Sequence, residues 1–180
     1  MKSSASHRLG TPRPAFPTAV RSNVKGKTLV SISAAVIWLS AASFLHAADP
    51  ALGTWKLNVA KSKYSPGPAP KSGNITFEAS GDAVKRTGEQ IAADGKKSSL
   101  SYTAKMDGKF YPVTGSDLYD EISIKKIDDH NTEATMKRAG KVAVNAKRNV
   151  SKDGKVMTIT IAGTNAKGEK INNVIVYDKH

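Results

Sequence analysis

The sequence contains no cysteine among its 180 residues. This absence excludes a disulfide framework, a thiol nucleophile and every metal site that depends on thiolate ligands. Aromatic residues are also scarce, at 6% of the chain, and no acidic residue precedes Asp49 although six basic ones do. The length allows one domain, so packing and backbone pairing alone must hold its fold together.

The segment 1–48 has the composition of an export signal. After the basic stretch comes an uncharged apolar run, Leu29–Leu45, and small residues follow at Ala47 and Ala48. This is the layout of a secretory signal peptide. We therefore expect the segment 1–48 to be removed by cleavage after Ala47 or Ala48, leaving a periplasmic or secreted protein. An uncleaved membrane anchor is the alternative, but a run of this length that includes four serines lies at the short limit for a bilayer span.

The region before Val24 is long for the basic part of a signal peptide and shows no periodicity, which favours a translation start at Val24 from a GTG codon. Of the formal net charge of +13, six positive charges belong to the segment 1–48, so the segment 49–180 retains a balance of +7. That balance permits an anionic partner such as an envelope surface. Export argues against nucleic acid as a partner.

Turn signals recur along the rest of the chain, among them Asp94-Gly95, Asp107-Gly108 and Asp153-Gly154. Eight such turns separate nine short segments after Asn74, and residues 53–58 add a tenth. Within the segments apolar residues alternate with polar ones, which indicates strands with one buried face. The predicted fold class is all-β, an antiparallel up-and-down β-barrel of about 8–10 strands over residues 49–180. A β-sandwich is the alternative fold.

Two segments need separate predictions. Residues 60–73 contain three prolines and two glycines, which exclude a regular strand or helix, so we expect an extended cover across one mouth of the barrel or a solvated surface loop. On the last segment, the alternation predicts that Val174 and Val176 lie on the buried face.

The two ends of the segment 49–180 carry a resemblance. It opens on Gly53-Thr54-Trp55 and closes on Val176-Tyr177-Asp178-Lys179, and with the strand count this resembles the fatty-acid-binding-protein and lipocalin group. The resemblance implies an interior ligand site, structural roles for Gly53 and for a Trp55 that plugs one end, and a ligand contact at Tyr177. Arg148, after Lys147, is similar to an internal arginine of fatty-acid-binding proteins. The chain departs from that family in its Pro-rich segment, which replaces a helical lid, and in Ile175, which replaces a clamp arginine.

Alternation also places three cations, Lys126, Arg138 and Arg148, in line with inward-facing positions. Hairpin turns near Asp129 and near Ala139 would put Thr132 opposite both Lys126 and Arg148. A buried cation needs an anion, so the functional interpretation is a cavity that receives an amphipathic anion. The alternative is that these residues lie at strand ends, where their charges reach water. Six aromatic residues would either line the cavity or fill the barrel: Phe77, Tyr102, Phe110, Tyr111, Tyr119 and Tyr177.

The sequence thus predicts a monomeric, non-catalytic barrel that binds a small hydrophobic or amphipathic ligand without a cofactor or metal ion. His130 lies in a turn and His180 at the end of the chain, so neither suits a catalytic base. One alternative is a filled barrel that docks on an anionic envelope surface or protein through its basic strands. A barrel isomerase or lyase that uses Tyr with Lys or Asp is the last alternative. The candidate ligand contacts are Arg148, Tyr177, Tyr102, Lys126 and Arg138.

Overall fold

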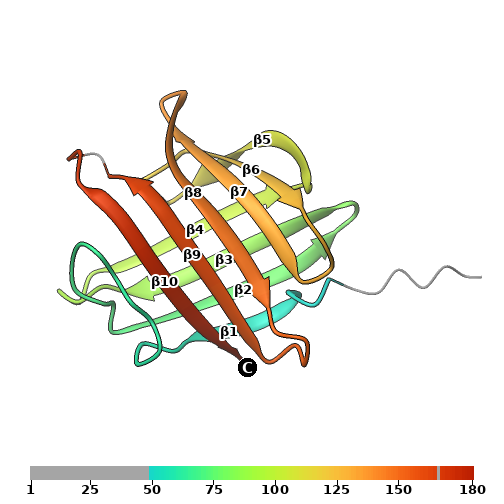
Figure 1. Ribbon diagram of the computed structural model, residues 1–180, viewed down its shortest axis with the longest axis horizontal. Coiled ribbons are helices and arrows are strands. Elements are labelled where there is room, and N and C mark those ends of the chain that lie inside the picture. The colour runs from blue at the N-terminus through green and yellow to red at the C-terminus, as the bar shows by residue number, and fades with distance from the viewer. Residues whose placement is uncertain (1–48, 166) are drawn as a thin grey trace, which may run out of the picture. The chain divides into compact units, whose positions relative to one another are not determined.

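The computed structural model describes residues 49–165 and 167–180, so the predicted signal peptide and its start at Val24 lie outside the described residues. In this part of the chain no helix is long and apolar enough to span a membrane. Ten antiparallel strands form a closed barrel (Figure 1), which confirms the predicted all-β barrel and excludes the sandwich. The strands are β1 (Gly53–Leu57), β2 (Ser72–Ser80), β3 (Ala83–Ile91), β4 (Lys97–Ala104), β5 (Asp107–Thr114), β6 (Glu121–Lys126), β7 (Asn131–Arg138), β8 (Lys141–Val150), β9 (Val156–Thr164) and β10 (Lys170–Lys179).

The barrel closes because β1 pairs on one side with β2 and on the other with β10. All other pairs join strands that are neighbours in the sequence. In Figure 1 the orange and red strands β7–β10 cross in front of the green strands β2–β4, with the barrel interior between them. The short strand β1 thus joins the first and last long strands of the sheet, and this closure leaves few unpaired strand edges.

The prediction of a turn at Asp107-Gly108 is wrong, because both residues belong to a strand. Strand β5 already begins at Asp107, and the register to β6 shifts between Asp107 and Phe110. Gly108 has a φ of 78°, and its carbonyl accepts a hydrogen bond of 2.8 Å from the Ser123 hydroxyl. The positive φ that glycine tolerates therefore serves a bulge inside the strand, while the chain turns at residues 105–106.

Pairing between β4 and β5 is short. The ladder contains Ser101 opposite Thr114 and Tyr102 opposite Val113. In the same register the next residue of β5 would be Pro112, which has no N–H to donate and so interrupts the ladder. This seam borders the interior at Tyr102.

The Pro-rich segment takes a different path from the predicted cover across a mouth. The Lys63 N–H donates to the Val174 carbonyl at 2.7 Å, the Val174 N–H donates back at 2.8 Å, and the Asn172 N–H donates to the Ser65 carbonyl at 2.8 Å. The segment therefore continues beyond β1 along the edge of β10 and completes the barrel wall. It is drawn to that edge because β1 pairs with β10 only up to Tyr177.

The predicted burial on β10 is confirmed for Val176, but this residue does not lie on the inner face of the strand. Ile175 and Tyr177 line the interior, whereas Val174 and Val176 lie on the other face, beside the segment that follows β1. Val176 is still buried there. Because apolar residues occupy both faces of this strand, alternation alone does not identify the inner one.

Two groups of buried side chains fill the barrel. The group that we call the closed end surrounds Trp55; it consists of Ala51, Trp55, Leu57, Ile75, Phe77, Val150, Met157 and Tyr177. The second group consists of Ala104, Val113, Ile122, Ile124, Met136 and Val144.

Candidate functional site

An interior cavity of about 110 Å³ borders both buried groups. Its wall is mostly isoleucine and aromatic, with two arginines. The lining residues are Phe77, Arg86, Tyr102, Tyr119, Ile122, Ile124, Thr132, Ala134, Met136, Ala146, Arg148, Ile159, Ile161, Ile175 and Tyr177.

Arg148 enters this cavity from β8. Thr132 lies opposite both Lys126 and Arg148 in the sheet, which confirms the predicted register. The Arg148 side chain is only 11% exposed, and its Nη2 lies 3.3 Å from Oδ2 of Asp49. Its guanidinium carbon lies 5.2 Å from the centroid of the Phe77 ring. The Nε of Arg148 is buried and finds no hydrogen-bond partner within residues 49–165 and 167–180.

A second arginine, Arg86, faces the same cavity and was not among the sequence-predicted contacts. It lies on β3 opposite Phe77 of β2 and Tyr102 of β4. Its guanidinium rests against Gly88, where an added Cβ would come within 2.9 Å of Cζ. Nη1 of Arg86 is buried, and no acceptor of the described chain reaches it. The cavity therefore contains two guanidinium groups, each with an unpaired buried donor.

Three tyrosines complete the polar part of the wall. Burial raises the pKa of Tyr102, and the charges of Arg86 and Arg148 act in the opposite direction. Burial likewise raises the pKa of Tyr119 to about 12 and that of Tyr177 above its ordinary value, with Arg86 opposing both. The phenols are therefore neutral at physiological pH and remain able to donate hydrogen bonds.

Asp49 is the carboxylate that approaches the cavity. Its Oδ2 meets Arg148, and its Oδ1 accepts a hydrogen bond of 2.9 Å from the Ala51 N–H. The Asp49 carbonyl accepts another, of 2.9 Å, from the Leu52 N–H. These contacts hold the carboxylate in a tight turn beside the barrel end.

Trp55 lies fully buried at the closed end. Its Nε1–H donates to the Ala51 carbonyl at 2.7 Å, and Nζ of Lys179 lies 4.3 Å from the centroid of its ring. Gly53 has a φ of 109°, and an added Cβ would lie 3.2 Å from Cε of Lys179. The Gly-x-Trp pattern thus brings backbone, indole and lysine together in one packed unit.

Lys126 and Arg138, two of the candidate contacts, lie outside the cavity. Nζ of Lys126 forms an ion pair of 2.7 Å with Asp129, which raises its pKa, and its side chain is 52% exposed. Nη1 of exposed Arg138 donates to the Ser116 carbonyl at 3.0 Å. Lys126 ends β6, and Arg138 follows a register shift in β7 after Met136. At such positions a long side chain reaches water, so strand alternation overestimates burial.

Two of the six predicted aromatic lining residues also lie elsewhere. Phe110 is 37% exposed, with Nζ of Lys137 at 3.7 Å from its ring centroid. Tyr111 packs against the second buried group, which agrees with the barrel-filling alternative, and its hydroxyl donates to Asp107 at 2.9 Å. Phe110 and Tyr111 are consecutive on β5, so they cannot share one face of the sheet.

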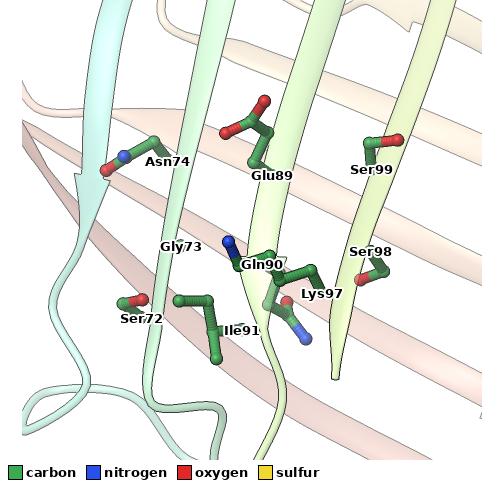
Figure 2. Close-up of a pocket in the computed structure, with 9 residues that line it drawn as sticks. All are labelled: Ser72, Gly73, Asn74, Glu89, Gln90, Ile91, Lys97, Ser98 and Ser99. Carbon is green, nitrogen blue, oxygen red and sulfur yellow. The ribbon is translucent and has the colours of Figure 1, made fainter. Parts of the chain in front are cut away.

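A more open groove lies on the outer surface of β2, β3 and β4. Figure 2 shows its polar side chains spread along the three strands, among them Asn74, Glu89 and Ser99. It has no aromatic wall and no buried charge, so it resembles an ordinary solvated sheet surface. In the described part of the chain, no group of three His, Asp or Glu side chains is placed to hold a metal ion.

Comparison with known proteins leaves the family open. No protein-family model and no curated protein matches the chain. Among solved structures it is similar to two redesigned β-barrels, mFAP1 and mFAP0, each bound to DFHBI. mFAP1 is 12% identical with a TM-score of 0.40, covering 70% of this chain and 94% of that one. mFAP0 is 15% identical with a TM-score of 0.38, covering 70% and 97%. Both TM-scores are low, so the functional argument rests on this chain's own residues.

Proposed function

We propose that this protein is an exported, monomeric, non-catalytic barrel of the lipocalin-like kind that binds a small, largely apolar organic anion in its interior. One observation carries the proposal. The apolar cavity contains two guanidinium groups, Arg86 and Arg148, and each keeps a buried N–H donor without an acceptor in the described chain.

Such donors are costly. A buried donor without a partner destabilises a protein by about 1–3 kcal/mol, and more when the group is charged. A ligand carboxylate would accept hydrogen bonds from both guanidinium groups and neutralise charge. The isoleucines of the wall would then surround its apolar part.

The cavity limits the size of this ligand. At about 110 Å³ it is smaller than the roughly 150 Å³ cavities that hold benzene, and below the roughly 300–1,000 Å³ of ordinary ligand pockets. The proposed ligand is therefore a short-chain acid. A long-chain fatty acid would require the barrel to open.

The absence of catalysis is part of the proposal. Asp49 is already engaged with Arg148 and the Ala51 N–H. His130 lies at the tip between β6 and β7, with Nδ1 at 3.1 Å from the Val150 carbonyl. Neither side chain is placed to exchange a proton with a molecule in the cavity.

Native mass spectrometry of the protein purified from its own host, followed by extraction of bound compounds, tests the proposal. We expect a stoichiometric small acid that is absent from the Arg148→Met protein and retained by the Lys126→Met protein. A mass free of ligand, with no uptake of added short-chain acids, would contradict the proposal. Salt-sensitive binding to anionic vesicles would then favour the filled barrel that docks through its basic strands.

A further inference from the structure

We propose that Asp49 sets the charge of the ligand, so that the cavity selects a monoanion over a neutral molecule or a dianion of the same length. This inference rests on the proposed function and specifies its ligand class. The observation that carries it is one fixed carboxylate, Asp49, paired with Arg148 in a cavity that also contains Arg86.

The ionisable groups of the cavity wall are few. They are Arg86, Arg148 and three tyrosines. Guanidinium groups do not lose their proton in proteins, and the tyrosines are neutral at physiological pH. With Asp49 paired to Arg148, the cavity keeps a net charge of +1. An uncompensated charge in an apolar interior is expensive, so one further negative charge is the favoured content.

Asp49 is held as a permanent counterion. Its carboxylate is bonded to the Ala51 N–H, and the Ala51 carbonyl accepts the indole N–H of Trp55 at 2.7 Å. The first described residues are therefore hydrogen-bonded to the largest fully buried side chain of the barrel. A ligand that displaced Asp49 would have to break this packed turn.

The free donors also match one carboxylate. Arg148 uses Nη2 on Asp49 and keeps Nε, while Arg86 keeps Nη1. Arg86 lies opposite Phe77 in the sheet, and the Arg148 guanidinium carbon lies 5.2 Å from the centroid of the Phe77 ring, so both arginines lie beside the same aromatic side chain. Two unpaired donors can serve the two oxygens of one carboxylate. A second carboxylate on the ligand would find neutral phenols, Thr132 and the isoleucine wall but no further cation, so its charge would remain uncompensated.

The test uses three probes with the same carbon chain: butyrate, its neutral amide butyramide, and the dianion succinate. Each is titrated into the full protein, and binding is followed by calorimetry and by the NMR signal of the Arg148 Nε–H group. For the wild type we expect butyrate to bind at least roughly tenfold more tightly than either other probe.

The decisive variant is Asp49→Asn, with Asp153→Asn as a control on an exposed turn. Loss of the fixed carboxylate raises the cavity charge to +2, so the preference for butyrate over succinate should fall by roughly tenfold or reverse. Asp49→Glu, which keeps the carboxylate, should retain the wild-type preference. The Arg86→Met variant, which leaves a net charge of zero, should instead prefer butyramide, and it tests the same inference should Asp49→Asn fail to fold.

The outcomes separate the inference from the proposed function. If no probe binds the wild type, the proposed function fails. If butyrate and butyramide bind equally well, the barrel is a ligand carrier but the monoanion inference is overturned. An unchanged ratio of butyrate to succinate in folded Asp49→Asn, or a persistent preference for butyrate in Arg86→Met, would also overturn it.

Discussion

The closed end and the cavity are built from several of the same strands but treat buried polar atoms differently. At the closed end the Trp55 indole N–H is satisfied by the Ala51 carbonyl. In the cavity Arg86 Nη1 and Arg148 Nε are equally buried, and nothing in the described chain accepts from them. The fold therefore pairs the neutral indole donor but leaves two guanidinium donors, which form stronger hydrogen bonds, without an acceptor in the described chain.

This difference separates stability from binding. Filling the closed end removes apolar surface from water and stabilises the barrel. The free arginines lower its stability, and a ligand that pairs with them would restore it, because anything that binds only the folded state raises the free energy of unfolding. Variants at the two regions should therefore change stability in opposite directions.

The largest effect is expected at Trp55. Trp55→Ala removes a fully buried ring and should lower the free energy of unfolding by about 3–5 kcal/mol, as large-to-small core substitutions do. Urea unfolding followed by circular dichroism measures this. Phe110→Ala, which removes a partly exposed ring, is the control and should lower the free energy of unfolding by less than about 1 kcal/mol. A similar small loss at Trp55 would show that the closed end is not the main source of stability.

Alkaline pH should destabilise the barrel through Tyr119. Its pKa is about 12 in the folded protein and about 10 in the unfolded chain. The unfolded state therefore loses the proton first, so the contribution of the neutral phenol is complete below about pH 10 and is lost as the pH rises towards 12. The full difference amounts to about 2–3 kcal/mol. Unfolding of the wild type and of Tyr119→Phe over this range isolates it, and identical pH profiles would refute it.

Arg86→Met should stabilise the ligand-free protein. It removes a half-buried cation whose Nη1 is buried without a partner in the described chain, and an apolar replacement of similar volume should add about 1–3 kcal/mol to the free energy of unfolding. The same variant should lose butyrate binding. Lys85→Met, on the outer face of the same strand, should change stability by less than about 0.5 kcal/mol. A marked loss of stability in Arg86→Met would mean that this arginine is structural.

Gly88→Ala should displace the Arg86 guanidinium while leaving its charge in place. The new Cβ would lie 2.9 Å from the Arg86 guanidinium and push it out of place. Because the residue lies inside a strand, the change in backbone entropy favours alanine, so stability should change by less than about 1 kcal/mol. Butyrate binding should weaken by roughly tenfold, whereas Thr87→Ala, which faces outward, should bind normally. Unchanged binding in Gly88→Ala would show that Arg86 need not hold its position.

Features of the fold that depend on local sequence were predictable, whereas features that depend on tertiary pairing were not. The ten strands were predictable because turn chemistry is local, and Arg148 was predictable because β8 alternates clearly. Arg86 was missed because apolar residues are sparse on β3 and do not alternate visibly. Pairing residues outward from the hairpin turn at Gly81 places Arg86 opposite Phe77 and would have identified it. The inner face of β10 and the path of the Pro-rich segment depend on each other through tertiary pairing, which no local pattern contains.

The smallest effects are expected at the strand ends. Lys126→Ala and Arg138→Ala remove exposed cations whose partners, Asp129 and the Ser116 carbonyl, also remain in water. Exposed pairs of this kind contribute little, so each variant should change stability by less than about 1 kcal/mol and leave butyrate binding unaltered. Arg148→Ala, in contrast, should abolish binding although it belongs to the same inward-facing series by alternation. Calorimetric titration of the three variants measures this, and a loss of binding in Lys126→Ala or Arg138→Ala would extend the ligand site to the rim of the barrel.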